Sequence, residues 1–321
     1  MPQSEFDIIK TYFLNQKVKR DDVGLGIGDD AALTSVPDGM QLAVAIDTLV
    51  EGIHFPENTS AEDIAFKALA VNLSDLAAMG AEPAWFTLAL TLPESNSQWL
   101  KSFASGLFSL ANKYNMQLIG GDTTRGPLTI SIQVAGYVPA GKALKRSGAR
   151  VGDRVYVTGT LGDAALGLRC IQHHAKYGSE QQAIEKLNRP QPRVNAGMAI
   201  LDLASACIDI SDGLVSDLGH ILEASQAGAS LNRAAIPLSK AIQQLCADDE
   251  ANYSLALSGG DDYELCFCAS PENEKTLQSV FNQLNIKLTC IGEIEQQTGL
   301  RLHHNGTSCA LKAQTGYEHF V

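Results

Sequence analysis

Apolar runs bounded by turn residues predict several strands along this chain. The runs are AALTSV and MQLAVAI near residue 40, WFTLALTL at 85–92, MQLIGGDTT, TISIQVAGYV, RVYVTG and ACIDI. Pro37-Asp38-Gly39 separates the first two runs and is a strong turn signal, so we expect these runs to form a hairpin. Later in the chain, YSLALSGGDDYELCFCAS predicts a strand, an acidic turn and a second strand.

The clearest helical pattern covers residues 60–80. Ser60 and Asp63 give it a start that resembles a capping box, and Gly80 followed by Pro83 ends it. Further helices are expected at 5–15, 97–115, 161–178, about 191–206 and 211–228. Strands and helices alternate irregularly, with hairpins among them. We therefore predict an α/β fold with α+β character, in which mixed sheets are flanked by helices.

The segment PAGKALKRSGARVGD at 139–153 is the best candidate for a domain boundary, because it is rich in glycine and basic residues. A chain of 321 residues is long enough for two domains that each bury a core. We expect domains at 1–138 and 139–321.

Composition and charge exclude several classes of partner. Lys and Arg total 24 against 36 Asp and Glu, which gives a formal net charge of −12. Nucleic acid and anionic membranes reward clustered positive charge, so we expect neither as a partner. The start, MPQSEFDIIKTYF, does not have the pattern of a signal peptide, and no apolar run is long enough to cross a bilayer. We expect a cytoplasmic protein.

The stretch GLGIGDDAAL at 24–33 matches the glycine pattern of a dinucleotide-binding loop, with Asp47 about twenty residues further on. A true dinucleotide fingerprint follows a strand and opens a helix whose amides receive the pyrophosphate. This loop follows a charged segment, leads into predicted strands and carries two carboxylates, Asp29 and Asp30. We therefore interpret the match as coincidental and expect either a cation or water at these aspartates.

Aspartates end many of the apolar runs. The set comprises Asp29, Asp30, Asp47, Asp122, Asp209, Asp212, Asp261 and Asp262. Asp75 joins it as the only charged residue between Lys67 and Glu82, within an apolar helical stretch. A single Gly-Asp pair is most simply a turn, but several carboxylates that converge need cations to offset their repulsion. Oxygen ligands without His or Cys favour Mg²⁺, Mn²⁺ or Ca²⁺ over zinc, and Mg²⁺ sites often include substrate phosphates.

Positive charge for a phosphate ligand is concentrated in one region. Lys142, Lys145, Arg146, Arg150 and Arg154 follow one another closely, and Arg125 comes just after GGDTT. No Walker A loop occurs. A solvated basic turn explains most of these residues, whereas a guanidinium at Arg146 or Arg125 suits phosphate oxygens.

Nine segments together resemble the thiamine-monophosphate kinase family. They are LGIGDDAAL, AIDTLVEGIHF, ALAVNLSDLAAMGAEP, LIGGDTTRG, LKRSGARVGD, VTGTLGDAALGL, IDISDGLVSDLGHI, LSGGDDYELCF and GYEHF. The similarity runs from about residue 5 to 320 in the family's order. This family belongs to an ATP-binding superfamily shared with aminoimidazole ribonucleotide synthetase and selenophosphate synthetase.

The resemblance implies transfer of the γ-phosphoryl group of ATP to thiamine monophosphate, which gives thiamine diphosphate. It also implies several Mg²⁺ ions and a homodimer whose N-terminal domains pair their sheets into a barrel-like core. By position, the metal ligands are Asp30, Asp47, Asp75, Asp122, Asp209 and Asp212, with backbone groups of Ala45 and Ile46. Gly121, Asp122, Arg146 and Ser211 match ATP-binding positions, and His54, Asp261 and Tyr317 match positions that hold thiamine monophosphate. Asp29 matches a supporting position beside the ligands.

Two positions depart from the family pattern, and several alternatives stay open. Asp261 stands where the family more often has glutamate, which puts the reach of this carboxylate in doubt, and Ile46 replaces a small polar residue. Tyr317 could instead be a C-terminal aromatic packed on the core. Alternative functions are another ATP-dependent phosphotransferase of the superfamily, a metal-dependent phosphohydrolase, and a metal or nucleotide sensor without catalysis. The first cysteine is Cys170, which argues against a selenophosphate synthetase with a reactive N-terminal thiol.

Overall fold

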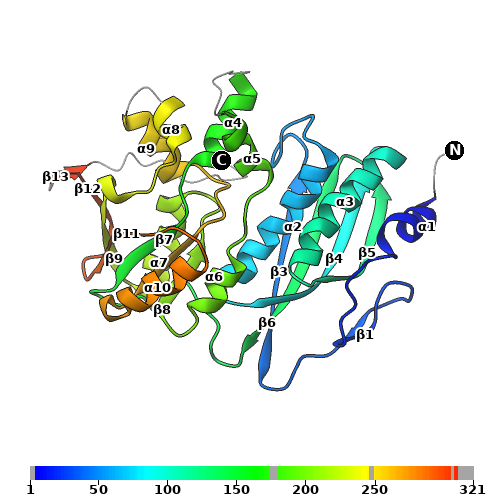
Figure 1. Ribbon diagram of the computed structural model, residues 1–321, viewed down its shortest axis with the longest axis horizontal. Coiled ribbons are helices and arrows are strands. Elements are labelled where there is room, and N and C mark those ends of the chain that lie inside the picture. Colours follow the sequence, from blue (N-terminus) through cyan, green and yellow to red (C-terminus); the bar gives the residue numbers. More distant parts are fainter. Residues whose placement is uncertain (1–3, 174–179, 246–248, 305–306, 310–321) are drawn as a thin grey trace. The chain divides into compact units, whose positions relative to one another are not determined.

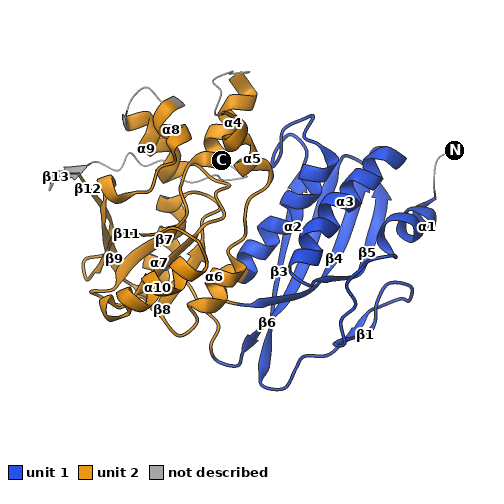
Figure 2. Cartoon of the chain, viewed as in Figure 1, with its two compact units in different colours: residues 1–76, 81–141 blue, residues 77–80, 142–321 orange. Residues whose placement is uncertain are grey.

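The structure is a computed structural model that describes residues 4–173, 180–245, 249–304 and 307–309. The chain divides into two compact units, residues 1–76 with 81–141 and residues 77–80 with 142–321 (Figure 2). Each unit has its own sheet.

Unit 1 contains a four-stranded mixed sheet with strand order β3-β6-β4-β5. Its strands are β3 (Met40–Val50), β4 (Glu82–Leu92), β5 (Gln117–Arg125) and β6 (Thr129–Pro139). β6 runs antiparallel to both β3 and β4, whereas β4 and β5 are parallel. A parallel pair needs a crossover, and α3 (Ser97–Lys113) supplies it.

Helices α2 (Ala61–Ala78) and α3 lie side by side over one face of this sheet (Figure 1). They approach closely at Gly106, where any side chain would overlap with the backbone of Glu62. α2 is buried along most of its length, which explains why its sequence has so few charged residues.

The N-terminal segment of unit 1 differs from expectation. α1 (Glu5–Ile8) continues into a π-helical turn, η1 (Ile9–Phe13), and β1 (Val23–Leu25) follows. The expected hairpin is wrong: β2 (Leu33–Thr34) pairs with β1, while β3 pairs with β6. The turn at Pro37-Asp38-Gly39 is present, since the amide of Met40 donates to the carbonyl of Pro37 (3.1 Å). The turn therefore reverses the chain without pairing the runs on either side of it.

Unit 2 contains a seven-stranded sheet with strand order β13-β12-β9-β11-β7-β10-β8. Its strands are β7 (Arg154–Thr158), β8 (Ala204–Asp209), β9 (Gly228–Asn232), β10 (Leu265–Ala269), β11 (Leu288–Glu295), β12 (Gly299–His304) and β13 (Thr307–Cys309). All neighbours are antiparallel except β12 and β9. The helices are α4 (Asp163–His173), α5 (Glu180–Asn188), α6 (Val194–Ala199), α7 (Leu214–Ser225), α8 (Lys240–Leu245), α9 (Asp249–Ser258) and α10 (Glu274–Gln283). Short 3₁₀ turns lie at Arg233–Ala235 and Pro271–Asn273.

The strand expected at YSLALS is wrong, because these residues belong to α9. The run is short and apolar, and periodicity alone does not separate a buried strand from a buried helix in such a run. Tyr253, Ala256 and Leu257 pack into the same apolar cluster as α7, so tertiary contacts select the helix. The helix expected at about 191–206 is also shorter, since α6 spans Val194–Ala199.

Candidate active site

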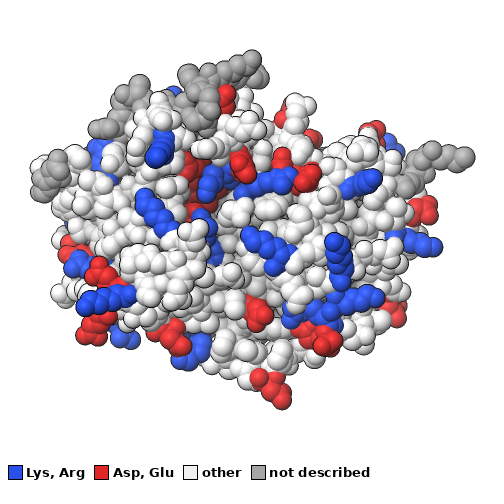
Figure 3. Space-filling view, viewed as in Figure 1, with Lys and Arg blue, Asp and Glu red and all other residues white. Residues whose placement is uncertain are grey.

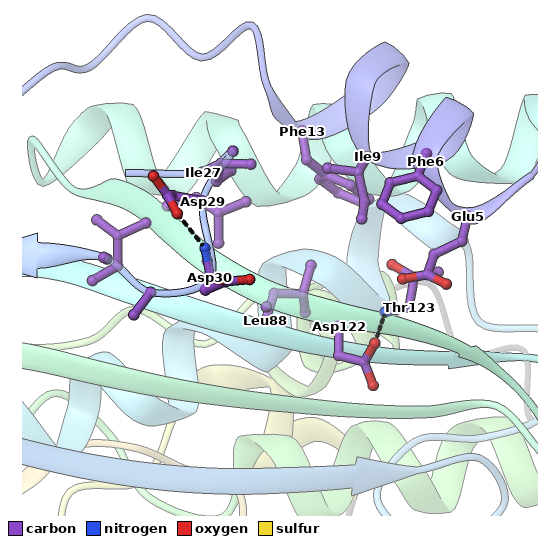
Figure 4. Close-up of a pocket in the computed structure, with 17 residues that line it drawn as sticks. Glu5, Phe6, Ile9, Phe13, Ile27, Asp29, Asp30, Leu88, Asp122 and Thr123 are labelled. Carbon is purple, nitrogen blue, oxygen red and sulfur yellow. Dashed lines mark hydrogen bonds between the residues drawn. The ribbon is translucent and has the colours of Figure 1, made fainter. Parts of the chain in front are cut away.

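Three of the predicted site residues lie around one pocket of about 560 Å³ in unit 1. Asp30 comes from the loop between β1 and β2, and Gly121 and Asp122 come from β5. Phe6, Ile9 and Phe13 of the N-terminal helical segment form an opposite, apolar wall (Figure 4). The pocket therefore combines carboxylates, to which Glu5 beside Phe6 adds one, with an apolar wall.

The aspartates of this pocket arrange the backbone beside them. Asp29 Oδ1 accepts a hydrogen bond from the amide of Asp30 (2.9 Å), and Asp122 Oδ1 accepts one from the amide of Thr123 (2.9 Å). The loop follows the strand β1, contrary to expectation, but it leads into β2 and not into a helix, so the helix N-terminus of a dinucleotide fingerprint is missing here. Gly121 is packed so closely on β4 that a side chain there would overlap with the carbonyl of Leu88.

The sheet register relates Asp47 to this pocket. Gly121 lies beside Leu88, Leu88 opposite Ile132, and Ile132 opposite Asp47. Neighbouring strands are about 4.8 Å apart, so Asp47 and Gly121 are separated by about 14 Å along one row of the sheet.

Asp47 lies against α2. Its amide donates to Oδ1 of Asn72 (3.1 Å), and the Asn72 side-chain amide donates to the carbonyl of Ala68 (2.9 Å). Asp75 is three residues after Asn72, on the same side of the helix, and is half-buried. Burial raises the pKa of the Asp47 carboxyl, which means that its charged form is disfavoured here until a cation compensates it. Both carboxyls are partly buried, and their role as metal ligands stays a prediction.

His54 is held in the turn after β3. The amide of Val50 donates to Nδ1 of His54 (3.0 Å), so Nδ1 is unprotonated and the neutral ring carries its proton on Nε2. The buried Lys67 donates from Nζ to the carbonyl of His54 (3.0 Å). Both bonds fix the position of this predicted substrate residue.

In unit 2, the loop after β8 is organised by Asp217, which was not among the predicted site residues. Asp209 ends β8, and the amides of Ser211, Asp212 and Gly213 all donate to Oδ2 of Asp217 (3.0, 3.0 and 3.1 Å). Burial is the main cause that raises the pKa of Asp217 to about 7. The available signal was an acidic residue in the first turn of a helix that follows a predicted ligand loop.

The loop that carries Asp261 is bound to the same segment. The amide of Asp261 donates to the carbonyl of Ser211 (2.8 Å), and the amide of Tyr263 donates to the carbonyl of Ile210 (2.8 Å). The Tyr263 hydroxyl lies 3.1 Å from Oδ1 of Asp261 and donates to it. Asp261 and Tyr263 have φ values of 68° and 49°, which side-chain-bearing residues adopt uncommonly outside functional or constrained loops. Unit 2 thus joins a predicted substrate residue to the predicted ATP and metal residues.

A buried polar cluster supports this arrangement and was also missed from the sequence. Glu264 accepts hydrogen bonds from Arg193 and from Thr158 Oγ1 (2.6 Å), and Asp262 accepts one from the amide of Gly162 (2.7 Å). These residues are far apart in the sequence, so no local pattern indicates the pairing. Burial, with Asp163 and Glu264 nearby, raises the pKa of Asp262 well above its usual range.

Arg146 and Tyr317 were also predicted to contact the substrates. Arg146 is exposed, and its carbonyl accepts from Ser225 Oγ (3.3 Å). Tyr317 lies outside the described residues. Among the described residues, no three His, Cys, Asp or Glu side chains are grouped closely enough to form a metal site by themselves. The metal set stays a prediction, with Asp30, Asp47, Asp75 and Asp122 in unit 1 and Asp209 and Asp212 in unit 2.

The surface shown in Figure 3 has basic and acidic residues interspersed, without a continuous basic stripe. Among the described helices, none has both the length and the apolar character needed to cross a membrane.

Comparison with known families assigns each half of the chain to a family. The family "AIR synthase related protein, N-terminal domain" matches residues 28–138, and "AIR synthase related protein, C-terminal domain" matches residues 150–305. The fold is therefore that of the AIR synthase related proteins, a class in which two α/β domains follow one another in the chain.

Comparison with individual proteins identifies the family within this class. The thiamine-monophosphate kinase of Salmonella typhimurium is 50% identical over 325 residues, covering 100% of this chain and 99% of that protein. The crystal structure of thiamine-monophosphate kinase from Stenotrophomonas maltophilia is 45% identical, with a TM-score of 0.85 over 91% of this chain and 93% of that one. A complex described as AaThiL with AMPPCP and TMP is 29% identical, with a TM-score of 0.78 over 98% and 94% of the two chains. The chain belongs to the thiamine-monophosphate kinase family.

Proposed function

We propose that this protein transfers the γ-phosphoryl group of ATP to thiamine monophosphate and forms thiamine diphosphate and ADP. The observation that carries the proposal is the full-length 50% identity to a thiamine-monophosphate kinase. A structural neighbour in complex with AMPPCP, an ATP analogue, and TMP supports the same pair of substrates.

The nucleophile of this reaction is a phosphate oxygen that is already anionic near neutral pH, so no general base is required. The difficulty is to bring two polyanions together in a protein whose formal net charge is −12. When bound, Mg²⁺ supplies neutralisation of phosphate charge and alignment of the transferred group. The residues of the chain then hold the metal ions and orient the two phosphate-bearing substrates.

We assign the metal-holding role to the carboxylates that the family pattern implies. They are Asp30, Asp47, Asp75, Asp122, Asp209 and Asp212, with backbone groups of Ala45 and Ile46. The distance of about 14 Å between the Asp47 and Gly121 neighbourhoods supports more than one Mg²⁺ position, since a single ion binds ligands within about 2.1 Å.

We assign Gly121, Asp122, Arg146 and Ser211 to ATP and His54, Asp261 and Tyr317 to thiamine monophosphate. The pocket beside Gly121 supports the nucleotide assignment, because its apolar wall suits a purine ring and its acidic side suits metal-bound phosphates. The hydrogen bond from Tyr263 to Asp261 supports a fixed orientation for the shorter carboxylate at this position.

We further propose a homodimer in which the sheets of unit 1 pair. Leu42, Val44 and Ile46 lie on one face of the edge strand β3 and are exposed, with Ile46 at 65% and Val44 at 50%. A row of exposed apolar side chains on an edge strand supports burial against a second copy.

Incubation of the purified protein with ATP, Mg²⁺ and thiamine monophosphate, followed by chromatography, tests the function. Parallel samples contain thiamine in place of the monophosphate, or no acceptor. We expect thiamine diphosphate and equimolar ADP with the monophosphate alone. ADP and inorganic phosphate without thiamine diphosphate would indicate a phosphohydrolase. Nucleotide binding without turnover would indicate a sensor.

A further inference from the structure

Asp217 is nearly completely buried, with 2% exposure, and stands in the first turn of α7. Its Oδ2 accepts three hydrogen bonds from the consecutive amides of Ser211, Asp212 and Gly213. In return, the amide of Asp217 donates to the carbonyl of Gly213 (3.0 Å). One buried side chain thus binds three consecutive amides of the loop between β8 and α7.

From these contacts we propose that Asp217 is a positioning residue that sets the shape of the loop 210–213 for the nucleotide and its metal ions. The inference rests on the proposed function, because it takes Ser211 as an ATP contact and Asp212 as a metal ligand. Asp217 itself is not assigned as a ligand, because its side chain is buried and its Oδ2 already accepts three amide hydrogen bonds.

Two residues accept the amides of residues 210–213. The amide of Ile210 donates to the carbonyl of Glu264 (2.8 Å), whereas the next three amides all depend on Asp217. Gly213 has a φ of 115°, and a side chain there would overlap with the backbone of Ser258. Without the carboxylate, three neighbouring donors lose their acceptor at once, so the loop has to rearrange or admit water.

The consequence extends to the acceptor side of the site. The carbonyls of Ile210 and Ser211 accept the amides of Tyr263 and Asp261, so a change in the loop is transmitted to the residue assigned to thiamine monophosphate. Asp217 therefore positions both the nucleotide loop and the substrate loop while contacting neither substrate.

The test compares Asp217→Ala with Asp217→Asn and with Asn96→Ala. Asn96 is a matched control, because it caps α3 by accepting the amides of Gln98 (3.0 Å) and Trp99 (3.1 Å) and is not assigned to the site. The affinity for AMPPCP in the presence of Mg²⁺ is measured by calorimetry without any acceptor, alongside melting temperature, kcat and KM.

We expect Asp217→Ala to weaken Mg²⁺-dependent AMPPCP binding by at least about tenfold, since a small misplacement of positioning groups is costly. We expect the Mg²⁺ concentration for half-maximal binding to rise as well. Asn96→Ala lowers the melting temperature but leaves nucleotide affinity unchanged. Asp217→Asn keeps an acceptor oxygen and recovers part of the affinity.

Nucleotide affinity within twofold of wild type in Asp217→Ala overturns the proposal, as does an equal loss of affinity in Asn96→Ala. If Asp217→Ala does not fold, Asp217→Asn decides: we expect it to bind AMPPCP more than twofold more weakly than wild type, and an affinity within twofold overturns the proposal. A wild-type protein that binds AMPPCP with Mg²⁺ but forms no thiamine diphosphate refutes the proposed function and leaves the Asp217 comparison decisive. A wild-type protein that binds no nucleotide refutes both.

Discussion

The guanidinium of Arg193 donates two hydrogen bonds to the carboxylate of Glu264, whose exposure is only 2%. The Nε–Oε2 distance is 2.6 Å. Thr158 donates to the same carboxylate, and its hydroxyl oxygen accepts the amide of Leu265 (2.9 Å). This cluster joins the end of β7, the start of β10 and the residue before α6.

Arg193→Ala is therefore expected to lower the free energy of unfolding by about 3–5 kcal/mol, the usual result of leaving a buried charge without its partner. Urea denaturation measures this loss. Arg154 is the matched control, since it pairs with Glu293 at 2.8 Å with both side chains more than 40% exposed. Arg154→Ala should cost about 1 kcal/mol or less. Similar losses in both variants would show that the buried Arg193–Glu264 pair stabilises the fold no more than an exposed ion pair does.

The raised pKa of Asp262 predicts that the stability of the folded protein depends on pH. Burial, with Asp163 and Glu264 nearby, raises its pKa in the folded protein. As pH rises above about 4, the unfolded chain releases this proton while the folded protein retains it, so this residue lowers stability with increasing pH. Asp262→Asn keeps an acceptor for the Gly162 amide and removes the titration.

Urea denaturation of Asp262→Asn in EDTA, from pH 5 to 8, checks this expectation. The variant should gain stability relative to wild type as pH increases. Asp38→Asn, in an exposed turn, should show a pH-independent difference. A constant difference for Asp262→Asn as well would contradict the raised pKa.

Gly121→Ala should weaken nucleotide binding and destabilise unit 1. Its Cβ would overlap with the carbonyl of Leu88, and overpacking of this kind costs about 1–3 kcal/mol. Gly24 of β1 is the matched control, because it does not line this pocket and a Cβ there would come no closer than 3.8 Å to another residue. Calorimetry with AMPPCP and thermal melting should show losses for Gly121→Ala and small changes for Gly24→Ala. Equal behaviour of the two variants would mean that close packing at Gly121 is unimportant.

The sequence predicted the features that depend on local patterns. Asp30, Asp122, Asp209 and Asp212 were selected because each follows an apolar run, and the structure places them in strands or in the loops beside strand ends. Asp30, Gly121 and Asp122 meet at one pocket because β5 and the loop before β2 converge there.

The features that depend on distant pairing could not be predicted. Arg193 and Glu264 are 71 residues apart, and neither lies in a motif that indicates the other. The strand partner of β3 was missed because the turn at 37–39 is compatible with either pairing, and the sheet register decides between them. α9 was mistaken for a strand because its short apolar run becomes helical through packing against α7.

Val44→Asp is expected to disrupt the proposed homodimer. Val44 is half exposed on β3, and burying an unpaired carboxylate in an interface costs several kcal/mol. Light scattering after size-exclusion chromatography should show monomers for Val44→Asp and dimers for wild type. Val151→Asp introduces the same charge at an exposed valine outside the sheets and should remain dimeric. A monomeric wild-type protein, or a dimeric Val44→Asp variant, would refute the proposed interface.

Asp47→Asn should separate stability from activity. Burial raises the pKa of Asp47, so its ionised carboxylate is unfavourable in the metal-free protein, and a neutral amide of the same shape avoids that cost. In EDTA the melting temperature of the variant should therefore equal or exceed that of wild type. With Mg²⁺ and ATP, turnover should be abolished, because a neutral amide cannot replace a carboxylate as the charged ligand of a divalent cation.

Wild type should gain melting temperature when Mg²⁺ and AMPPCP are added, and Asp47→Asn should gain little. Asp38→Asn should behave as wild type in every measurement. Normal turnover in Asp47→Asn would show that this carboxylate does not hold a metal ion. Loss of both turnover and stability would instead assign Asp47 to the fold.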